Sequence, residues 1–204
     1  MSVELAQSAG FCFGVDRAVS TVYRLLEEGK PAATLGPIIH NPQLVADLAA
    51  RGVRAVSSPE ETPPGHVLVI RSHGVPQSTV DRLEELGIPY VDATCPFVKK
   101  IHDLARRAGE EGKLFLLFGD AGHPEVQGIV GHCTGPYFIC KNSEELAEAL
   151  KNHPEWAQKP IAVAAQTTFH TGEWQICLET LKNVCTTPLF LLQYVMQLRN
   201  GKRG

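Results

Sequence analysis

The sequence lacks the charge and the long apolar runs that mark nucleic-acid-binding and membrane proteins. Its 204 residues carry a formal net charge of −3 at pH 7, which provides no basic surface for nucleic acid or an anionic membrane. The longest apolar runs, such as LFLLFG and IAVAA, are far too short to span a bilayer. The first residues, MSVELAQSAGF, lack the basic and then apolar layout of a secretion signal. We therefore expect a cytoplasmic protein that binds neither nucleic acid nor a membrane.

Closely spaced cysteine pairs are also missing. The six cysteines include no CxxC pair, and in a reducing compartment they are better read as thiols, metal ligands or catalytic groups than as disulfides. Separated cysteines on loops suit a metal site closed by different domains. Three of them fall in a loop, a strand and a helix face, where we expect ordinary packing or surface thiols: Cys133, Cys140 and Cys177.

What the sequence does contain is a regular alternation of strand and helix patterns. Expected strands are GHVLVIRS, IPYVDAT, GKLFLLFGD, GPYFIC and KPIAVAAQ, most of them apolar throughout, as in strands covered on both faces. Expected helices are VDRAVSTVYRLLEEG, PQLVADLAARG, PQSTVDRLEELG, PFVKKIHDLARRAGEEG, SEELAEALKNH and TGEWQICLETLKNV. Several begin at Pro or a Ser/Thr cap and stop at Gly. This alternation predicts an α/β protein with parallel sheets.

The pattern divides the chain into two similar small parallel-sheet α/β domains and a tail. The first domain is expected over residues 1–95 and the second over residues 96–187. Residues 188–204 hold a short apolar run and a basic finish for which the sequence offers no partner helix or strand. We expect this tail to be aberrant and poorly packed.

Histidine and cysteine recur at one structural position. His40, His73, His123 and Cys95 each follow an expected strand and precede a helix, and Cys12 lies in a Gly-flanked turn that enters a helix. Carboxyl ends of parallel strands line the ligand crevice of open α/β sheets, and helix N-termini favour a bound anion. The remaining histidines lack this context and are expected to be surface or structural residues: His66, His102, His132, His153 and His170.

Such a set of side chains suits an anionic substrate. Three histidines can neutralise and hydrogen-bond a phosphate or diphosphate. Glu125 can donate or accept a proton, or it can simply favour the dipole of its helix. Thr167 and Thr168 can bond a substrate oxygen, or they can cap the helix that begins near Thr171. Two cysteines cannot hold a zinc ion or an iron–sulfur cluster by themselves.

The order of the motifs resembles one family. GFCFGVDRAV, HNP, RSHGVP, VDATCPFVKK, GHPEVQG and QTT occur in the order and spacing of 4-hydroxy-3-methylbut-2-enyl diphosphate reductase, over residues 3 to 187 or so. The resemblance implies three α/β domains around a central cleft that holds a 4Fe-4S cluster. It also implies a reaction of the non-mevalonate isoprenoid pathway, in which two electrons and protons remove the substrate's hydroxyl as water and leave isopentenyl or dimethylallyl diphosphate.

The same resemblance assigns roles to residues of this chain. Cys12 and Cys95 are implied as cluster ligands, and His40, His73 and His123 as contacts of the diphosphate and the hydroxyl end of the substrate. Glu125 is implied as the proton relay, assisted by Thr167. The cofactor carries out the redox chemistry, with electrons from a small ferredoxin or flavodoxin.

The chain departs from the family where the third domain should begin. The family's third cluster cysteine lies in a stretch resembling TICNAT, followed by an R-Q pair, and neither occurs here; Cys185 is a substitute only by its proximity in sequence. Reading the tail from each codon's third base permits T-I-C-N-A-T across residues 192–198, with R-Q further on. We hypothesise a frameshift, and expect a labile or absent cluster and little activity. The alternatives are a zinc- or anion-binding α/β module and an inactive fragment.

Overall fold

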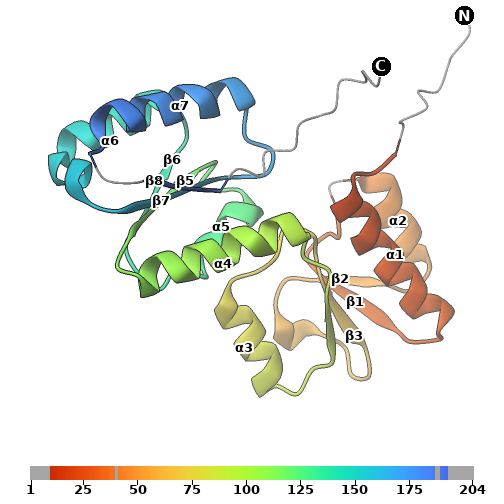
Figure 1. Ribbon diagram of the computed structural model, residues 1–204. Helices are drawn as coiled ribbons and strands as arrows, with labels where there is room; N and C mark the ends of the chain where they lie inside the picture. The colour runs from red at the N-terminus through yellow and green to blue at the C-terminus, as the bar shows by residue number, and fades with distance from the viewer. Residues whose placement is uncertain (1–9, 40, 187–188, 193–204) are drawn as a thin grey trace, which may run out of the picture. The chain divides into compact units, whose positions relative to one another are not determined.

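The structure is a computed structural model that describes residues 10–39, 41–186 and 189–192. The chain forms two compact units. The first comprises residues 1–74 and 79–96, and the second comprises residues 75–78 and 97–204. Figure 1 shows that each is built of strands and helices in alternation, and each is described by itself below.

The first unit is a parallel four-stranded sheet covered by helices. Its elements in chain order are α1 (Phe13–Glu27), β1 (Ala32–Leu35), α2 (Pro42–Ala50), β2 (Arg54–Val56), the 3-10 turn η1 (Pro59–Glu61), β3 (Val67–Ile70), α3 (Gln77–Glu85) and β4 (Tyr90–Asp92). The strand order is β2-β1-β3-β4. Helices α1 and α2 lie on one face of the sheet and α3 lies on the other (Figure 1). Val19 of α1 and Leu48 of α2 pack with Val69 of β3 in one buried cluster.

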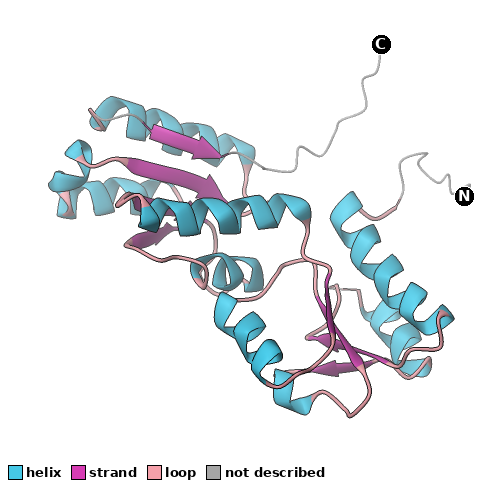
Figure 2. Ribbon diagram, turned by 60° about the horizontal axis from the view of Figure 1, so that its bottom comes forward, coloured by secondary structure: helices cyan, strands magenta, loops and turns pink. Residues whose placement is uncertain are grey.

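The second unit repeats this plan. Its elements are α4 (Pro96–Glu110), β5 (Leu114–Phe118), α5 (Pro124–Val130), β6 (Tyr137–Cys140), α6 (Ser143–Asn152), the 3-10 turn η2 (Pro154–Gln158), β7 (Ile161–Ala165), α7 (Thr171–Val184) and β8 (Leu189–Leu192). The strand order is β6-β5-β7-β8, and all pairs are parallel (Figure 2). The two units therefore share one topology.

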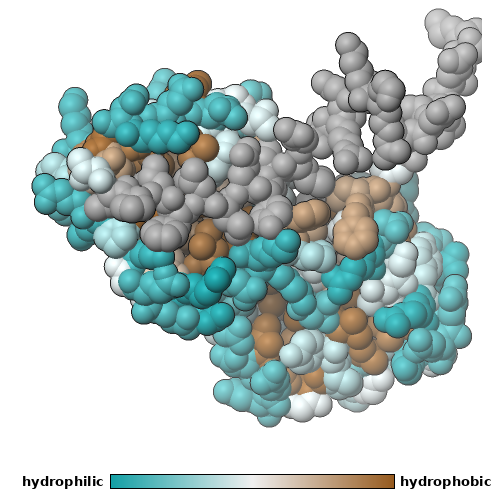
Figure 3. All heavy atoms as spheres, viewed as in Figure 1, coloured by the Kyte–Doolittle hydropathy of each residue, from teal (hydrophilic) through white to brown (hydrophobic). Residues whose placement is uncertain are grey.

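Both faces of the second sheet are covered. Leu116 and Phe118 of β5 pack against Trp174 of α7, while Phe115 and Leu117 of the same strand face the helices α4 and α5. This is the alternation of a strand that is buried on both sides. The outer side of α6 and α7 is mostly hydrophilic (Figure 3). The sheet thus forms the centre of this unit.

The expected α/β fold is confirmed, and the five expected strands appear as β3 to β7. β2 and β8 were not identified from the sequence, and β1 was expected only as the strand before His40. Length does not explain this, since β1, β2 and β8 have 4, 3 and 4 residues and the expected strands β3 and β4 have 4 and 3. β1 is the weakly marked segment AATL, and β8 lies in the tail for which no partner was expected. β8 corrects the expectation that the tail has no partner, since Leu189–Leu192 pair with Ile161–Ala164 of β7.

The topology places one special position in each sheet. In the first unit the chain passes from β1 outward to β2 and then returns across β1 to β3. In the second unit it passes from β5 to β6 and returns to β7. The carboxyl ends of β1 and β3, and those of β5 and β7, are therefore the points where the winding direction reverses. Ligands of open α/β sheets bind at such points.

Among the residues that the structure describes, the helices include none with the length and apolarity that crossing a membrane requires.

Candidate functional site

A buried carboxyl group lies at the β5/β7 switch point of the second unit. Glu125, in the first turn of α5, is only 2% exposed, and Thr167, two residues after β7, is 8% exposed. The backbone N–H of Thr167 donates to Oε1 of Glu125 over 2.6 Å. The Thr167 hydroxyl donates to Oε2 over 2.7 Å. Thr167 therefore donates a hydrogen bond to each oxygen of a carboxyl group that is shielded from water.

Burial and hydrogen bonding act on the pKa of this carboxyl group in opposite directions. Desolvation raises the pKa of Glu125 above that of an ordinary glutamate, and the two hydrogen bonds from Thr167 oppose the rise because they stabilise the charged form. A hydroxyl beside a carboxyl group can either donate a proton or accept one. The pair therefore has the composition of a proton relay.

His123 lies at the start of the same helix and has a defined tautomer. It is the N-cap of α5, and its Nδ1 accepts from the backbone N–H of Glu125 over 3.1 Å. With Nδ1 accepting, the proton of the neutral ring is on Nε2. His123 thus presents a donor nitrogen on one side while it orders the first turn of α5 on the other.

Gln166 connects the loops that follow β5 and β7. Its Oε1 accepts from the backbone N–H of Asp120 over 3.2 Å, and its Nε2 donates to the hydroxyl of Thr168 over 3.0 Å. Gly119 leaves room for it, since a Cβ at this glycine would lie 3.0 Å from Oε1 of Gln166. Sequence reasoning missed Gln166, which directly follows β7 in the motif QTT.

In the first unit two thiols flank the beginning of α1. Cys12 is the N-cap of this helix and makes no side-chain capping bond. A Cβ built on Gly14 would lie 2.6 Å from Sγ of Cys95, so the absence of a side chain at Gly14 allows the Cys95 thiol to approach the first turn. Both thiols are partly exposed. The positive end of the helix dipole favours negative charge at this place.

Hydrogen bonds fix the loop that carries Cys95. Arg17, one turn into α1, donates from Nη1 to the carbonyl of Thr94 over 2.9 Å. The backbone N–H of Cys95 donates to the carbonyl of Ser72 over 2.9 Å. His73 follows Ser72 in the turn after β3, which the N–H of Gly74 closes by donating to the carbonyl of Arg71 over 3.0 Å. The carboxyl end of β3 and the Cys95 loop are therefore joined directly. His40 lies outside the described residues.

Three other cysteines and four other histidines have structural surroundings. Burial raises the pKa of Cys140 and of Cys177 to about 12 and that of Cys133 to about 11. The histidine rings stack or cap helices: His102 on His132 at 4.0 Å between centroids, His153 on Trp156 at 4.4 Å, and His170 as the N-cap of α7. Buried thiols of raised pKa are poor metal ligands.

The described residues contain no group of three or more His, Cys, Asp or Glu side chains placed to hold a metal ion. Cys12 and Cys95 nevertheless fit two of the thiolate positions of an iron–sulfur cluster, because they are partly exposed and meet at a helix N-terminus. A cluster also needs a further ligand.

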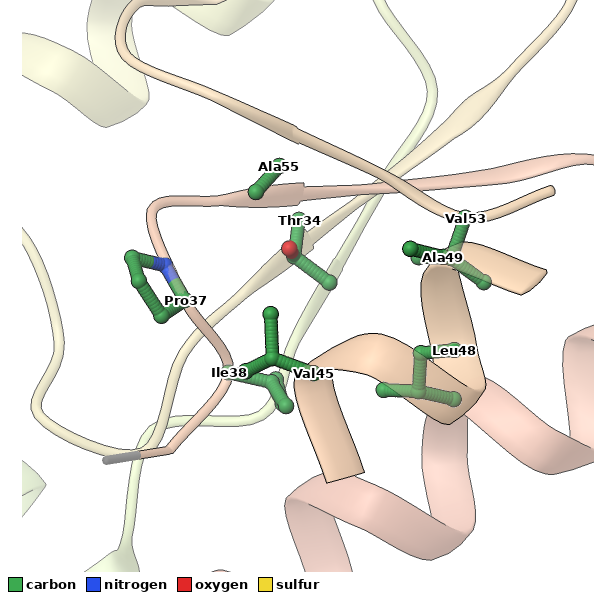
Figure 4. Close-up of a pocket in the computed structure, with 8 residues that line it drawn as sticks. All are labelled: Thr34, Pro37, Ile38, Val45, Leu48, Ala49, Val53 and Ala55. Carbon is green, nitrogen blue, oxygen red and sulfur yellow. The ribbon is translucent and has the colours of Figure 1, made fainter. Parts of the chain in front are cut away.

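A small apolar pocket of about 50 Å³ lies in the first unit, between α2 and strands β1 and β2 (Figure 4). Its lining consists of Thr34, Pro37, Ile38, Val45, Leu48, Ala49, Val53 and Ala55. None of the expected site residues is among them. The pocket therefore belongs to the packing of α2 and not to the candidate site.

Two doubly wound α/β units with polar or thiol side chains near the carboxyl ends of their strands define a class of protein that binds small ligands at those ends. Comparison with known proteins makes the assignment specific. The chain belongs to the LytB protein family, whose model matches residues 3–194.

The relatives and structural neighbours given below are all named diphosphate reductases. A 4-hydroxy-3-methylbut-2-enyl diphosphate reductase of Geobacter sulfurreducens is 42% identical over 184 residues, covering 90% of this chain and 60% of that protein. The corresponding protein of Thermoanaerobacter sp. (strain X514) is 40% identical over 186 residues, 89% of this chain and 62% of that one. The chain thus spans about 60% of the length of these relatives.

Two solved structures agree with this fold. A structure of (E)-4-hydroxy-3-methyl-but-2-enyl diphosphate reductase, the terminal enzyme of the non-mevalonate pathway, matches with a TM-score of 0.80 and 34% identity over 95% of this chain and 67% of that one. The reductase of Plasmodium falciparum matches with a TM-score of 0.78 and 27% identity over 87% of this chain and 55% of that one.

Proposed function

We propose that this chain carries two α/β units of a 4-hydroxy-3-methylbut-2-enyl diphosphate reductase. The observation that carries the proposal is the buried Glu125 carboxyl group closed by Thr167 at a sheet switch point. In the reaction a carbon–oxygen bond breaks and the hydroxyl leaves as water. Two electrons from a ferredoxin or flavodoxin and two protons balance the loss, and the product is isopentenyl or dimethylallyl diphosphate.

The second unit supplies protons and a hydrogen-bond donor. Glu125, with its pKa raised by burial, retains a proton at higher pH than an exposed glutamate and delivers it through the Thr167 hydroxyl to the leaving oxygen. His123 donates from Nε2 to an oxygen of the substrate. In the first unit, His73 at the end of β3, together with His40, contributes further donors to the diphosphate.

Cys12 and Cys95 would hold an iron–sulfur cluster, which supplies the electrons to the substrate when bound. Unpaired thiols suit a reducing compartment, so the proposal includes a cytoplasmic location.

The correspondence of the two sheets supports a position for a third thiol. β8 occupies in the second sheet the place that β4 occupies in the first, and Cys95 follows β4 by three residues. The chain has no cysteine after Cys185. We propose that the shifted reading frame, with a cysteine across Tyr194 and Val195, encodes this ligand; the coding DNA decides the point.

Turnover per bound iron tests the proposed function. The chain is reconstituted anaerobically with iron and sulfide, given a chemically reduced viologen and 4-hydroxy-3-methylbut-2-enyl diphosphate, and assayed for the two products by mass spectrometry. We expect slow turnover that Glu125→Gln reduces by roughly 100-fold or more, because a positioned proton donor contributes about that much.

Glu148→Gln, at an exposed position of α6, is the control and should turn over like the unaltered chain. Full cluster occupancy with normal turnover would contradict the expected low activity, and product formation by Glu125→Gln at the rate of the unaltered chain would contradict the role of Glu125.

A further inference from the structure

Arg71 occupies the β1/β3 switch point of the first unit. Leu35 pairs with Ile70 in the sheet register, so the next residues, Gly36 and Arg71, lie opposite each other at the carboxyl ends of the two strands. A Cβ built on Gly36 would lie 2.6 Å from Nη1 of Arg71. The guanidinium group therefore lies over the backbone of Gly36, and a glycine, with its φ of +72°, is what leaves it room.

The charge of Arg71 has no counterpart among the described residues. Its Nε is buried and makes no hydrogen bond there, and the described ion pairs of arginine involve other residues: Arg51, Arg82 and Arg106. Desolvation lowers the pKa of the Arg71 side chain. Partial burial of a cation without an anion costs free energy, and a bound anion would offset that cost.

The corresponding position of the second unit holds a polar side chain whose hydrogen bonds are made within the protein. Phe118 pairs with Ala165, so Gly119 and Gln166 correspond to Gly36 and Arg71. Gln166 also lies over its glycine, but both ends of its amide are engaged, with Asp120 and with Thr168. The same topological position thus holds an amide with both ends hydrogen-bonded in the second unit, and in the first unit a cation for which the described residues supply no anion.

We propose that Arg71 binds an oxyanion of a phosphate group at the switch point of the first sheet. The proposal rests on the proposed function, and it adds a binding residue for the substrate's diphosphate. Three observations support it: the position between β1 and β3, where ligands of doubly wound sheets bind; the glycine that accommodates the guanidinium; and the fork geometry by which arginine binds phosphate oxygens in pairs. His73 follows two residues later in the same turn.

Calorimetric titration with inorganic diphosphate tests the assignment on the whole chain. We expect Arg71→Gln to weaken the affinity by roughly tenfold or more, as loss of a charge-assisted hydrogen bond does. Arg71→Lys, which keeps the charge and loses the fork, should weaken it less. Arg54→Gln, an exposed arginine of β2, is the matched control and should change the affinity less than twofold.

Thermal unfolding without diphosphate separates binding from a structural role. Removal of an uncompensated cation should leave the melting temperature of Arg71→Gln unchanged or raise it. An affinity within twofold of the unaltered chain overturns the assignment, and so does a lower melting temperature accompanied by unchanged affinity.

His123→Ala distinguishes this proposal from the proposed function. Weaker diphosphate binding in His123→Ala but not in Arg71→Gln would reject only the role of Arg71. Weaker binding in Arg71→Gln but not in His123→Ala would reject the role given to His123 instead. An unaltered chain that binds no diphosphate contradicts both proposals.

Discussion

Glu125 is the residue at which burial has the clearest chemical consequence. Its carboxyl group is buried in the second unit, and both oxygens accept from Thr167. This buried acid is hydrogen-bonded and still able to exchange a proton, because the side chain that contacts it among the described residues is a hydroxyl that both donates and accepts. This combination supports a catalytic rather than a purely structural role.

The raised pKa of Glu125 predicts a specific dependence of stability on pH. The folded state binds this proton more tightly than the unfolded state, whose glutamate titrates near 4.3. The stabilisation is therefore complete below about pH 4.3 and is lost as the pH rises through the folded pKa, by at most about 1.4 kcal/mol per pH unit. Urea unfolding of the chain and of Glu125→Gln across this range should show the difference between them falling with pH.

Thr167 provides the control for that prediction. Thr167→Val removes the hydroxyl that lowers the pKa of Glu125, so the loss of stability with pH should occur at higher pH. Thr167→Ser keeps the hydroxyl and should leave the pH of this loss unchanged. A difference between the chain and Glu125→Gln that does not vary with pH would contradict the raised pKa.

At the scale of elements, the first turn of α1 is shaped by the thiol that packs on it. Gly14 lies in this turn, and a methyl group there would meet Sγ of Cys95 at 2.6 Å and its Cβ at 3.0 Å. In an unobstructed helix Gly→Ala gains up to about 1 kcal/mol. Here the added methyl group would crowd the Cys95 side chain, so the substitution should destabilise the fold. We expect Gly14→Ala to lower the free energy of unfolding by about 1–2 kcal/mol.

Gly172→Ala is the matched substitution, because Gly172 holds the same place in α7 and its added Cβ would meet only the His170 side chain, at 3.1 Å. Urea denaturation of the two variants makes the comparison. Stabilisation of the chain by Gly14→Ala would show that Cys95 does not approach α1 as described.

The sequence predicted the elements better than it predicted their contacts. Strands β5 and β7 are apolar throughout and were identified from that pattern, and the residues that follow them were correctly placed at the carboxyl edge. The bonds between Glu125 and Thr167 span 42 residues, a separation at which periodicity carries no information. The correspondence of Arg71 with Gln166 required the register of both sheets. β8, with 4 residues, is defined only by its pairing with β7.

At the scale of the whole molecule, both units follow one design: a four-stranded parallel sheet wound in the same order, with its polar groups at the switch point. The first unit also carries the thiols of Cys12 and Cys95 at the N-terminus of α1. The local structure thus places these polar and thiol side chains near the carboxyl ends of strands, whereas the pocket under α2 is lined mainly by apolar side chains.

The measurement that tests this account most directly is the content of iron and acid-labile sulfide after anaerobic reconstitution. We predict that the chain binds both in similar amounts, below full occupancy, and that Cys12→Ser or Cys95→Ser abolishes the binding while Cys133→Ser, at a half-buried thiol of raised pKa, leaves it unchanged. One zinc ion per chain without sulfide, or iron and sulfide that survive the loss of Cys12 and of Cys95, would contradict it.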